Sequence, residues 1–573
     1  MKIKFSIFII TILSSVALLN AQERTKDTID DQVVNVIKPY TPTISDAFKI
    51  KDTPKLNDSN AVKKKEITYN IFSIPVASTF TPAKGKAATV DKAKQVKLFD
   101  NYASLGFGSY TTILGEVYLN HELSSTENVG GYFSHHSSAG GIDGLLLDDD
   151  FIKTSLNAHY SQQLRDFSWK VDGGYDLQTY NWYGLPQNFF GQAEADLIDP
   201  GHSFNSFNIG GKLNFDDAII KDGSIRFRRF GDNLGSGENR LKLSGTAAIP
   251  IKDEIVETVV SIDYLVGSFE NDYFNTTKIN YGNFQLGLAP TYQLKQDDLT
   301  VNLGVTLTYL NDTEASKSSF FIYPNISASY RLVNEIVIAF GGVKGGLIQN
   351  SYYDFATENP FVSPTLFIAP TDQQYNAYAG LKGKLSNTIG YSVSGSYTSE
   401  KSKALFVNNP ITATTQDYTY GNSFGIIYDD VTTLGIAGEL SVDINRNFTM
   451  GIKGEYFVYN TKNEAEAWNL PNIKGTVFMD YQINEHWFTG GNLFFIGERK
   501  DVFLDLTTII PATTTVNLDG YVDVNAHVGY HVNDRISVFL KGNNLVGGSY
   551  NKWQNTPVQG IQFLGGATYK FDF

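Results

Sequence analysis

The chain has 573 residues, a formal net charge of -14, no cysteine, 51 glycines, 33 tyrosines and 39 phenylalanines. An acidic chain repels phosphate backbones, so we expect no nucleic-acid partner. The lack of cysteine excludes disulfides, thiolate metal sites and a lipid attached to an N-terminal cysteine. Many glycines and aromatic residues beside few prolines and methionines favour strands over packed helices.

The N-terminus has the pattern of a secretory signal peptide. Lys2 and Lys4 precede an apolar stretch that runs from Phe5 to Leu19, and Ala21 offers a small residue for cleavage. We therefore predict that residues 1–21 are a signal peptide and that the mature chain is exported, with an uncleaved anchor as the alternative. No later apolar run reaches about 18 residues, which argues against membrane-spanning helices.

Residues 22–100 differ in texture from the rest of the chain. They are polar, rich in Lys, Asp and Thr, and contain five prolines without a helical period. This composition predicts an extended or disordered periplasmic segment. One stretch within it, Tyr69–Phe80, is apolar enough to form a strand or a lumen insert, although Pro75 would interrupt a central strand.

From residue 101 to residue 573 the dominant pattern is strict alternation. In Leu299–Tyr309 every odd position is Leu, Val or Tyr and every even position is Thr, Asn or Gly, and the pattern returns in Leu434–Ile444 and Val522–Val532. About 9 to 11 tilted strand residues cross a bilayer, with one face toward lipid and the other toward a watery lumen. This region is therefore predicted to be an all-β, antiparallel transmembrane β-barrel.

Short polar turns alternate with long connections along the barrel region. The turns are Lys252–Asp253, Lys295–Asp298, Asn334–Glu335, Asn445–Asn447, Asn484–His486 and Asn533–Asp534, and the long connections are about 137–150, 180–202, 350–374, 409–422 and 507–516. Outer-membrane barrels have short periplasmic turns and long outer loops, which predicts the cell outer membrane as the location.

With both termini periplasmic, the alternation gives about 22 strands, within a range of roughly 18 to 24. The predicted strands start near residues 101, 112, 127, 151, 166, 204, 222, 239, 254, 277, 298, 318, 335, 375, 388, 423, 447, 468, 486, 517, 535 and 558. The pair near 204 and 222 is the least regular, because 215–223 resembles a loop and Arg226–Arg229 is unusually basic for a barrel wall. The final strand alternates strictly and ends on Phe573, the kind of strand that barrel-assembly machinery binds, so we expect it to serve insertion as well as closure.

Segments of the last third carry a family resemblance. These are Ala467–Pro471, Phe494–Phe503, Phe539–Leu545 and Gly565–Phe571, and together they resemble the C-terminal barrel of TonB-dependent receptors. The resemblance implies a receptor-type barrel of 22 strands over residues 101–573. Receptors of this family also carry an N-terminal plug, for which residues 22–100 are too few, so the resemblance implies a plugless variant. Asp31–Ile37 is a weak match to a TonB box. The resemblance therefore does not imply energised uptake for this protein.

Histidines are the candidate catalytic or metal-binding residues. His135 and His136 lie beside serines near the start of a predicted outer loop that ends in Asp148–Asp150, which would fit a hydrolytic or divalent-metal site. The alternative, a solvated polar loop, is the one we favour. His527 and His531 share a lumen face about 13 Å apart, too far for one metal ion. We expect no enzyme, no cofactor and no metal.

Aromatic residues in the long outer loops are the candidate ligand-binding site. Such clusters stack on sugars or anchor partner proteins. Alternatively, they fold over the barrel mouth or belong to the interfacial aromatic girdle. The residues are Trp182, Tyr183, Phe189, Phe190, Tyr352, Tyr353 and Phe355.

The sequence thus predicts a non-catalytic outer-membrane protein, either a passive channel or a transport-related receptor. A wide open barrel would leak, so residues 22–100, inward-folding loops or an envelope partner protein should occlude it. The alternative is a structural subunit of an outer-membrane assembly or secretion complex. The expected partners are outer-membrane lipid, the barrel-assembly machinery and envelope proteins.

Overall fold

The computed structural model describes residues 98–186, 189–216, 218–412, 416–444, 447–505 and 512–573. The predicted signal peptide, the periplasmic segment up to residue 97 and its stretch Tyr69–Phe80 lie outside the described residues.

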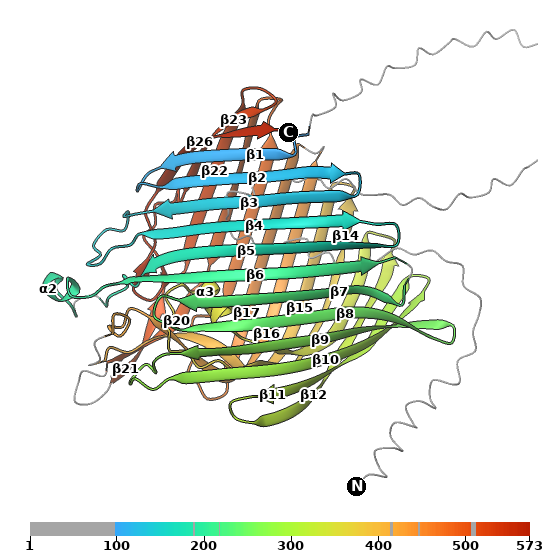
Figure 1. Cartoon of the computed structure of the whole chain (residues 1–573), viewed down its shortest axis with the longest axis horizontal. Coiled ribbons are helices and arrows are strands. Elements are labelled where there is room, and N and C mark those ends of the chain that lie inside the picture. The colour runs from blue at the N-terminus through green and yellow to red at the C-terminus, as the bar shows by residue number, and fades with distance from the viewer. Residues whose placement is uncertain (1–97, 187–188, 217, 413–415, 445–446, 506–511) are drawn as a thin grey trace, which may run out of the picture. The chain divides into compact units, whose positions relative to one another are not determined.

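The described chain forms one closed antiparallel barrel of 22 strands, in agreement with the predicted number (Figure 1). Neighbours in sequence are neighbours in the sheet, and the ring closes because β1 pairs with both β2 and β26. The first barrel strands are β1 (Asn101–Gly108), β2 (Ile113–Ser124), β3 (Glu127–Ser138), β4 (Phe151–Gln163), β5 (Phe167–Asn181), β6 (Gly201–Phe215), β7 (Ile220–Asp232), β8 (Gly237–Ile251), β9 (Glu254–Phe269), β10 (Ile279–Gln296) and β11 (Leu299–Asp312). The remaining ones are β12 (Lys317–Val333), β13 (Val337–Ile348), β14 (Thr371–Ser386), β15 (Ile389–Asn408), β16 (Phe424–Ile444), β17 (Phe448–Thr461), β18 (Ile473–Gln482), β19 (Trp487–Ile496), β22 (Tyr521–His531), β23 (Ile536–Asn543) and β26 (Gln562–Phe571).

The closing seam joins the two ends of the barrel region in continuous register. Ala103 lies opposite Tyr569, and the pairing extends from Asn101 opposite Phe571 to Gly108 opposite Leu564. On the lumen side, the buried hydroxyls of Ser104 and Thr568 are 3.0 Å apart. The prediction that the last strand closes the barrel is therefore confirmed.

Alternation along the strands separates an apolar outer face from a polar inner face. In β12, for example, Phe320 and Ile322 point outward and are more than half exposed, whereas the next residue, Tyr323, points inward and is buried. Such a belt of exposed aliphatic and aromatic side chains would be unfavourable in water, but it matches acyl chains. Within the described ranges, no helix is long and apolar enough to cross a membrane.

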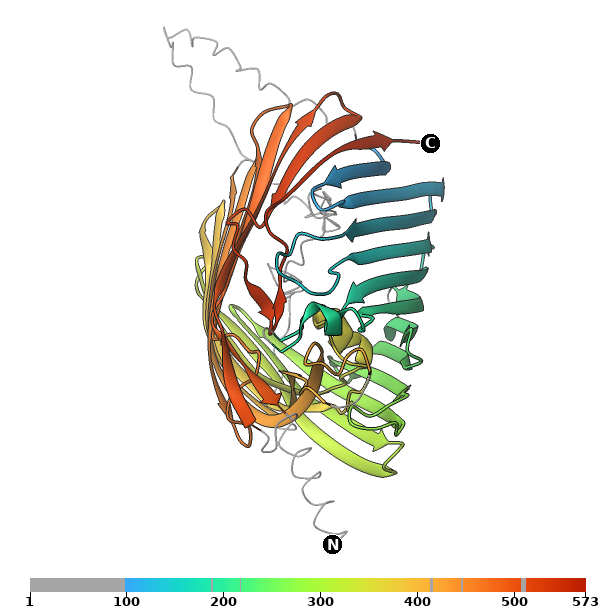
Figure 2. The ribbon, with the colours of Figure 1, turned by 90° about the vertical axis from the view of Figure 1, so that its left-hand side faces the viewer.

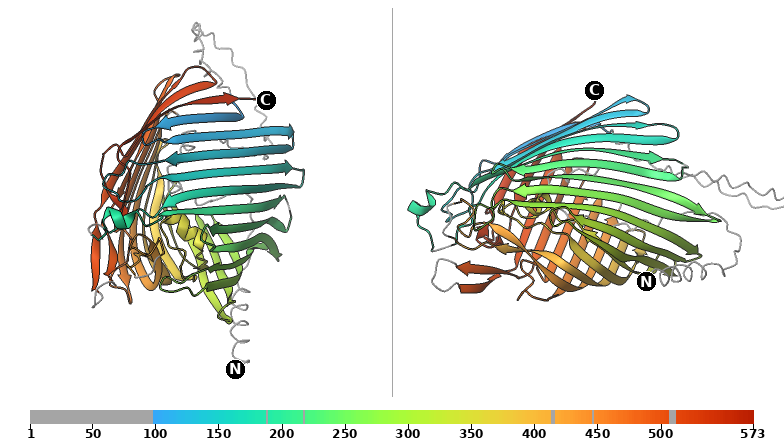
Figure 3. Two further views of the ribbon diagram at one scale, coloured as in Figure 1. Left: turned by 60° about the vertical axis from the view of Figure 1, so that its left-hand side comes forward. Right: turned by 60° about the horizontal axis from the view of Figure 1, so that its bottom comes forward.

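Short turns and long loops lie at opposite ends of the barrel, as predicted. The long connections carry the remaining elements: α2 (Gln192–Ala195), α3 (Tyr352–Glu358), the hairpin β20 (Arg499–Asp505) with β21 (Ala512–Leu518), and the small pair β24 (Asn551–Trp553) with β25 (Thr556–Pro557). Figure 3 shows α2 and the β20–β21 hairpin at the same end of the barrel. The short turns include 252–253 between β8 and β9 and 297–298 between β10 and β11. We therefore assign the long loops to the cell exterior and the short turns to the periplasm.

The basic stretch in β7 follows the same alternation. Arg226 faces the lumen and forms an ion pair with Asp172 at 2.8 Å. Arg228 shares that face, whereas Arg229 lies on the other side, where it donates to Asn239. Arg226 and Arg228 therefore mark the inner face of a regular strand, and the irregular region before it reduces to the turn between Phe215 and Ile220.

Candidate functional site

Several outer loops pack together over the mouth of the barrel. Buried aromatic and aliphatic side chains of these loops and of the adjoining strands form one continuous group. We call it the mouth cluster: Trp182, Phe204, Phe230, Leu265, Phe269, Tyr273, Tyr281, Tyr352, Phe355, Ala356, Phe361, Val362, Leu366, Ile368, Phe406, Tyr418, Phe424, Ile426 and Trp553. Its largest contribution comes from the β13–β14 loop, which carries α3. Figure 2 shows α3 within the ring of strands. Apolar burial of this extent stabilises the folded loops.

The start of α3 is held by a carboxylate of the barrel wall. Glu238, in β8, is almost completely buried and accepts the backbone N–H of Tyr352 at 2.8 Å and that of Tyr353 at 3.3 Å. It also accepts the hydroxyl of Tyr281 at 3.1 Å. Unpaired N–H groups at a helix start favour a negative charge, so Glu238 adds to the cap that Ser351 provides.

Arg240 lies two residues further along β8, on the same inner face. Its guanidinium makes a bidentate ion pair with Asp263 of β9, at 2.9 and 2.7 Å, and donates to Asp354 of α3 at 3.0 Å. It also donates to the backbone carbonyl of Gln349 at 3.3 Å. The arginine therefore joins two wall strands to the loop. We call Glu238, Arg240, Asp263 and Asp354 the latch.

Tyrosines of α3 extend these contacts to β7. The hydroxyl of Tyr352 donates to Asp232 at 2.8 Å, and burial next to this carboxylate raises the pKa of Tyr352 well above its usual value, so the hydroxyl stays a donor. Arg228 lies over the ring of Tyr353, 3.5 Å from its centre. Polar groups thus hold one side of the loop, while its other side packs through Phe355 against Phe406.

The β20–β21 hairpin and the β24–β25 pair complete the mouth. Trp553 packs against Phe406 and Phe424, and Arg499 donates to the carbonyls of Asn551 and Lys552. Asp501 of β20 is fully buried and accepts the backbone N–H of Asn408 at 3.0 Å. Burial raises the pKa of Asp501 to about 6.

The aromatic residues predicted to bind a ligand occupy two kinds of environment. Trp182, Tyr352 and Phe355 are 2%, 1% and 5% exposed, inside the mouth cluster. Tyr183, Phe190 and Tyr353 are half-buried, and Phe189 is 48% exposed. Phe189 packs on Phe503, and Phe190 packs on Tyr420. The ligand role of these residues stays a prediction, and the accessible ones are the natural first contacts.

The histidines do not form a common site. His135 and His136 lie near the end of β3, which runs to Ser138, just before the outer loop, so the interpretation of these two residues as part of a solvated polar loop was wrong. The alternation of the strand sends them to opposite faces: His135 contacts Thr154, and His136 packs on Phe151. Among the described residues, no three His, Asp or Glu side chains are placed to hold a metal ion.

Sequence reasoning missed the latch. Glu238 and Arg240 occupy alternate positions in a strand and have the ordinary pattern of lumen-facing residues. The nearest signal was the basic stretch Arg226–Arg229 of β7, which we interpreted only as unusual for a barrel wall. Their partners in α3 are more than a hundred residues away in sequence, and a single sequence does not reveal such pairs.

The barrel, its outer loops and its apolar belt define an outer-membrane protein of the receptor type. The sequence model of the family described as TonB dependent receptor-like, beta-barrel matches residues 93–545, and the chain belongs to that family. The suspected resemblance is confirmed. No curated protein sequence matches the chain.

Solved structures of low sequence identity share the fold. The FrpB iron transporter from Neisseria meningitidis (F3-3 variant) is 10% identical with a TM-score of 0.63, over 83% of this chain and 82% of that one. The ferric-catecholate import receptor Fiu from E. coli K12 is 12% identical with a TM-score of 0.60, over 84% and 83%. The ferripyoverdine receptor of Pseudomonas aeruginosa is 14% identical with a TM-score of 0.60, over 84% and 73%.

Proposed function

We propose that this protein is a non-catalytic, transport-related outer-membrane receptor in which the β13–β14 loop controls passage through the barrel. The observation that supports this most is the latch. A loop that enters the lumen is fastened to the wall by Glu238 and Arg240 through ion pairs and hydrogen bonds. The Asp354 side chain is 46% exposed, so its ion pair with Arg240 weakens with salt and exchanges with water or ligand groups, which suits a reversible closure.

In this proposal, the outer loops take the role that a plug has in other receptors of the family. The mouth cluster joins loops from β5–β6, β9–β10, β13–β14 and β15–β16 to Trp553 of the loop before β26. An aromatic layer of this breadth hinders the diffusion of polar solutes. The barrel then needs no separate plug to limit leakage, in keeping with the plugless variant that the sequence implied.

The first contact with a ligand is assigned to the accessible aromatics. Phe189 and Phe190 lie on the exterior side with Phe503 and Tyr420, and flat exposed rings bind sugars and aromatic groups by stacking. Trp182, Tyr352 and Phe355 meet a ligand only after the mouth cluster separates, because their side chains are buried. Binding at the surface would therefore precede opening.

The test is solute flux through liposomes that contain the purified protein. In one variant, two glycines replace residues 350–369. β13 and β14 stay paired because Ile348 lies opposite Thr371. A matched variant shortens the β3–β4 loop across 140–149, which contributes nothing to the mouth cluster. We expect the first deletion to raise the flux of a small sugar about tenfold or more and the second to leave it unchanged.

Folded barrels that show equal flux in all three proteins would contradict the proposal. The experiment also distinguishes the proposed receptor from the alternative, a structural subunit. A barrel that stays sealed after the loop is removed and co-purifies in fixed ratio with other envelope proteins would instead support a structural subunit of an assembly or secretion complex. The same purification detects bound barrel-assembly components.

A further inference from the structure

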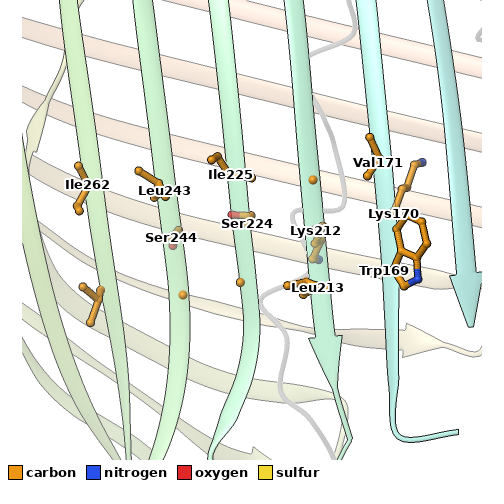
Figure 4. Close-up of a pocket in the computed structure, with 14 residues that line it drawn as sticks. Trp169, Lys170, Val171, Lys212, Leu213, Ser224, Ile225, Leu243, Ser244 and Ile262 are labelled. Atoms are coloured by element: carbon orange, nitrogen blue, oxygen red, sulfur yellow. The ribbon is translucent and has the colours of Figure 1, made fainter. Parts of the chain in front are cut away.

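A groove of about 630 Å³ runs along the outer surface of the barrel across β5 to β9. Figure 4 shows its lining residues on neighbouring strands. The outward-facing side chains that border it are Trp169, Val171, Leu213, Ile225, Leu243 and Ile262. It lies on the outer face of the barrel wall, whereas the latch faces the lumen, so that Ile262 of the groove and Asp263 of the latch are neighbours in β9 but point to opposite sides.

The groove opens toward lipid and not toward the lumen. Ile225 is 49% exposed and lies on the same face as Val171 and Leu213. Lys170, Lys212 and Ser224 alternate with these residues and therefore point to the other side of the wall. Apart from the backbone and the indole N–H of Trp169, the lipid side of the groove is hydrocarbon.

Three glycines form the floor of the groove. They occupy adjacent strands: Gly211 lies opposite Ile225, and Gly223 lies opposite Gly245. A Cβ atom added to Gly223 would meet nothing within 4 Å, and one added to Gly211 or Gly245 would make only ordinary contacts.

The contrast with lumen-facing glycines is clear. A Cβ on Gly210 would come within 2.8 Å of the Arg226 guanidinium, and one on Gly174 within 2.2 Å of Asn157. At the lumen-facing positions a larger residue would clash, which explains why glycine occurs there. At the groove positions a larger residue would fit, so packing within the barrel does not explain these glycines.

The depth of the groove indicates one leaflet. Trp169 is the third residue of β5 after the periplasmic turn, and Leu213 is the third from the periplasmic end of β6. The Trp169 ring packs 5.1 Å from Tyr160 and its Nε1 donates to Gln162 at 3.0 Å. Paired aromatics of this kind mark the headgroup level. The groove therefore begins at the inner interface and rises toward the bilayer centre.

We infer that this groove binds one acyl chain of a phospholipid from the inner leaflet. An empty groove in the hydrocarbon region would forfeit the dispersion contacts of its lining. Its volume holds about twenty groups the size of a water molecule or a methylene, on the order of one long acyl chain. The inference rests neither on the latch contacts nor on the proposed function.

The test counts phospholipids that stay bound to the full-length protein after mild detergent exchange, by native mass spectrometry. Gly223→Leu fills the groove without touching the fold. Gly454→Leu is the matched control, because Gly454 also faces lipid, on β17, and also has nothing within 4 Å of an added Cβ. We expect wild type and Gly454→Leu to retain about one phospholipid more than Gly223→Leu. Heat-modifiable migration verifies that each barrel is folded.

Two results would overturn the inference. One is equal retention of phospholipid by wild type and Gly223→Leu. The other is an envelope protein bound to wild type and Gly454→Leu but lost from Gly223→Leu, which would make the groove a protein contact. A folding failure of Gly223→Leu would be checked with Gly223→Ala and Gly245→Ala, which fill the floor partly and should reduce retention in steps.

Discussion

The guanidinium of Arg240 lies 3.0 Å from the carboxylate of Asp354, and this contact joins the barrel wall to the loop in its mouth. The arginine side chain is only 6% exposed, whereas that of Asp354 is 46% exposed. Asp263 neutralises Arg240 from the opposite side. When the loop moves away, Arg240 therefore stays paired with Asp263 and does not become an unpaired buried charge.

Removing the charge of Asp354 should loosen the loop without damaging the barrel. Asp354→Asn keeps the size of the side chain and leaves Arg240 paired with Asp263. Because Asp354 is half exposed, we expect a cost of ~1 kcal/mol, or about fivefold faster hydrogen exchange of the α3 amides. Glu270→Gln is the control, since it removes an exposed pair with Lys278 outside the latch. Unchanged α3 exchange in Asp354→Asn would refute the role of the latch.

The two tyrosines at the start of α3 should differ in their hydroxyl contributions. Tyr352→Phe removes a hydrogen bond to Asp232 from a side chain that is 1% exposed. It should lower the free energy of unfolding of the loop by ~1 to 2 kcal/mol. Tyr353→Phe keeps the ring over Arg228 and should change it by less than ~0.5 kcal/mol. Protection from proteolysis within the loop measures both, and equal effects would contradict the assignment.

Docking of the β20–β21 hairpin should strengthen in mild acid. Burial raises the pKa of Asp501 from 3.8 to about 6. The Asp501 carboxylate therefore binds a proton more tightly in the docked hairpin than in the detached one. This stabilisation is complete below the ordinary pKa and is lost as the pH rises through about 6. We expect hydrogen-exchange protection of residues 499–505, corrected for intrinsic rates, to rise about fourfold from pH ~7.5 to ~5.5.

Asp501→Asn should show no such pH dependence, because the side chain is neutral at both pH values. If the protection of residues 499–505 changed equally with pH in wild type and variant, the effect would have to come from another titratable group.

The closing seam predicts which cysteine pairs form a disulfide. The natural chain has no cysteine. Ala103→Cys with Tyr569→Cys places two thiols at directly opposed positions of β1 and β26, where Cα atoms are ~4.5 to 5.5 Å apart. Ala103→Cys with Phe571→Cys is displaced by two residues, which exceeds the reach of a disulfide. Oxidation should lock only the first pair, as seen by gel migration after denaturation. Cross-linking of the displaced pair alone would mean a different register.

Most of the barrel was predictable because its signal is local. Alternation and turn residues place each strand: the predicted starts near 101, 254 and 388 lie within a residue of β1, β9 and β15. The loops have no comparable repeat. That Trp182 stacks on His202, or that Glu238 caps α3, depends on which loops fold inward, and this is decided by contacts between distant parts of the chain. For the same reason, the predicted aromatic site divides into buried and accessible members.

Single-channel recording tests the central claim, that the latched loop closes the barrel. Wild type is compared with the double variant Glu238→Gln and Asp354→Asn, which removes both latch charges that hold α3. We predict that wild type is mostly closed, that the double variant is open at least about tenfold more often with the same unitary current, and that high salt shifts wild type in the same direction. Wild-type barrels that are permanently open, or folded double-variant barrels that stay as closed as wild type, would contradict the account.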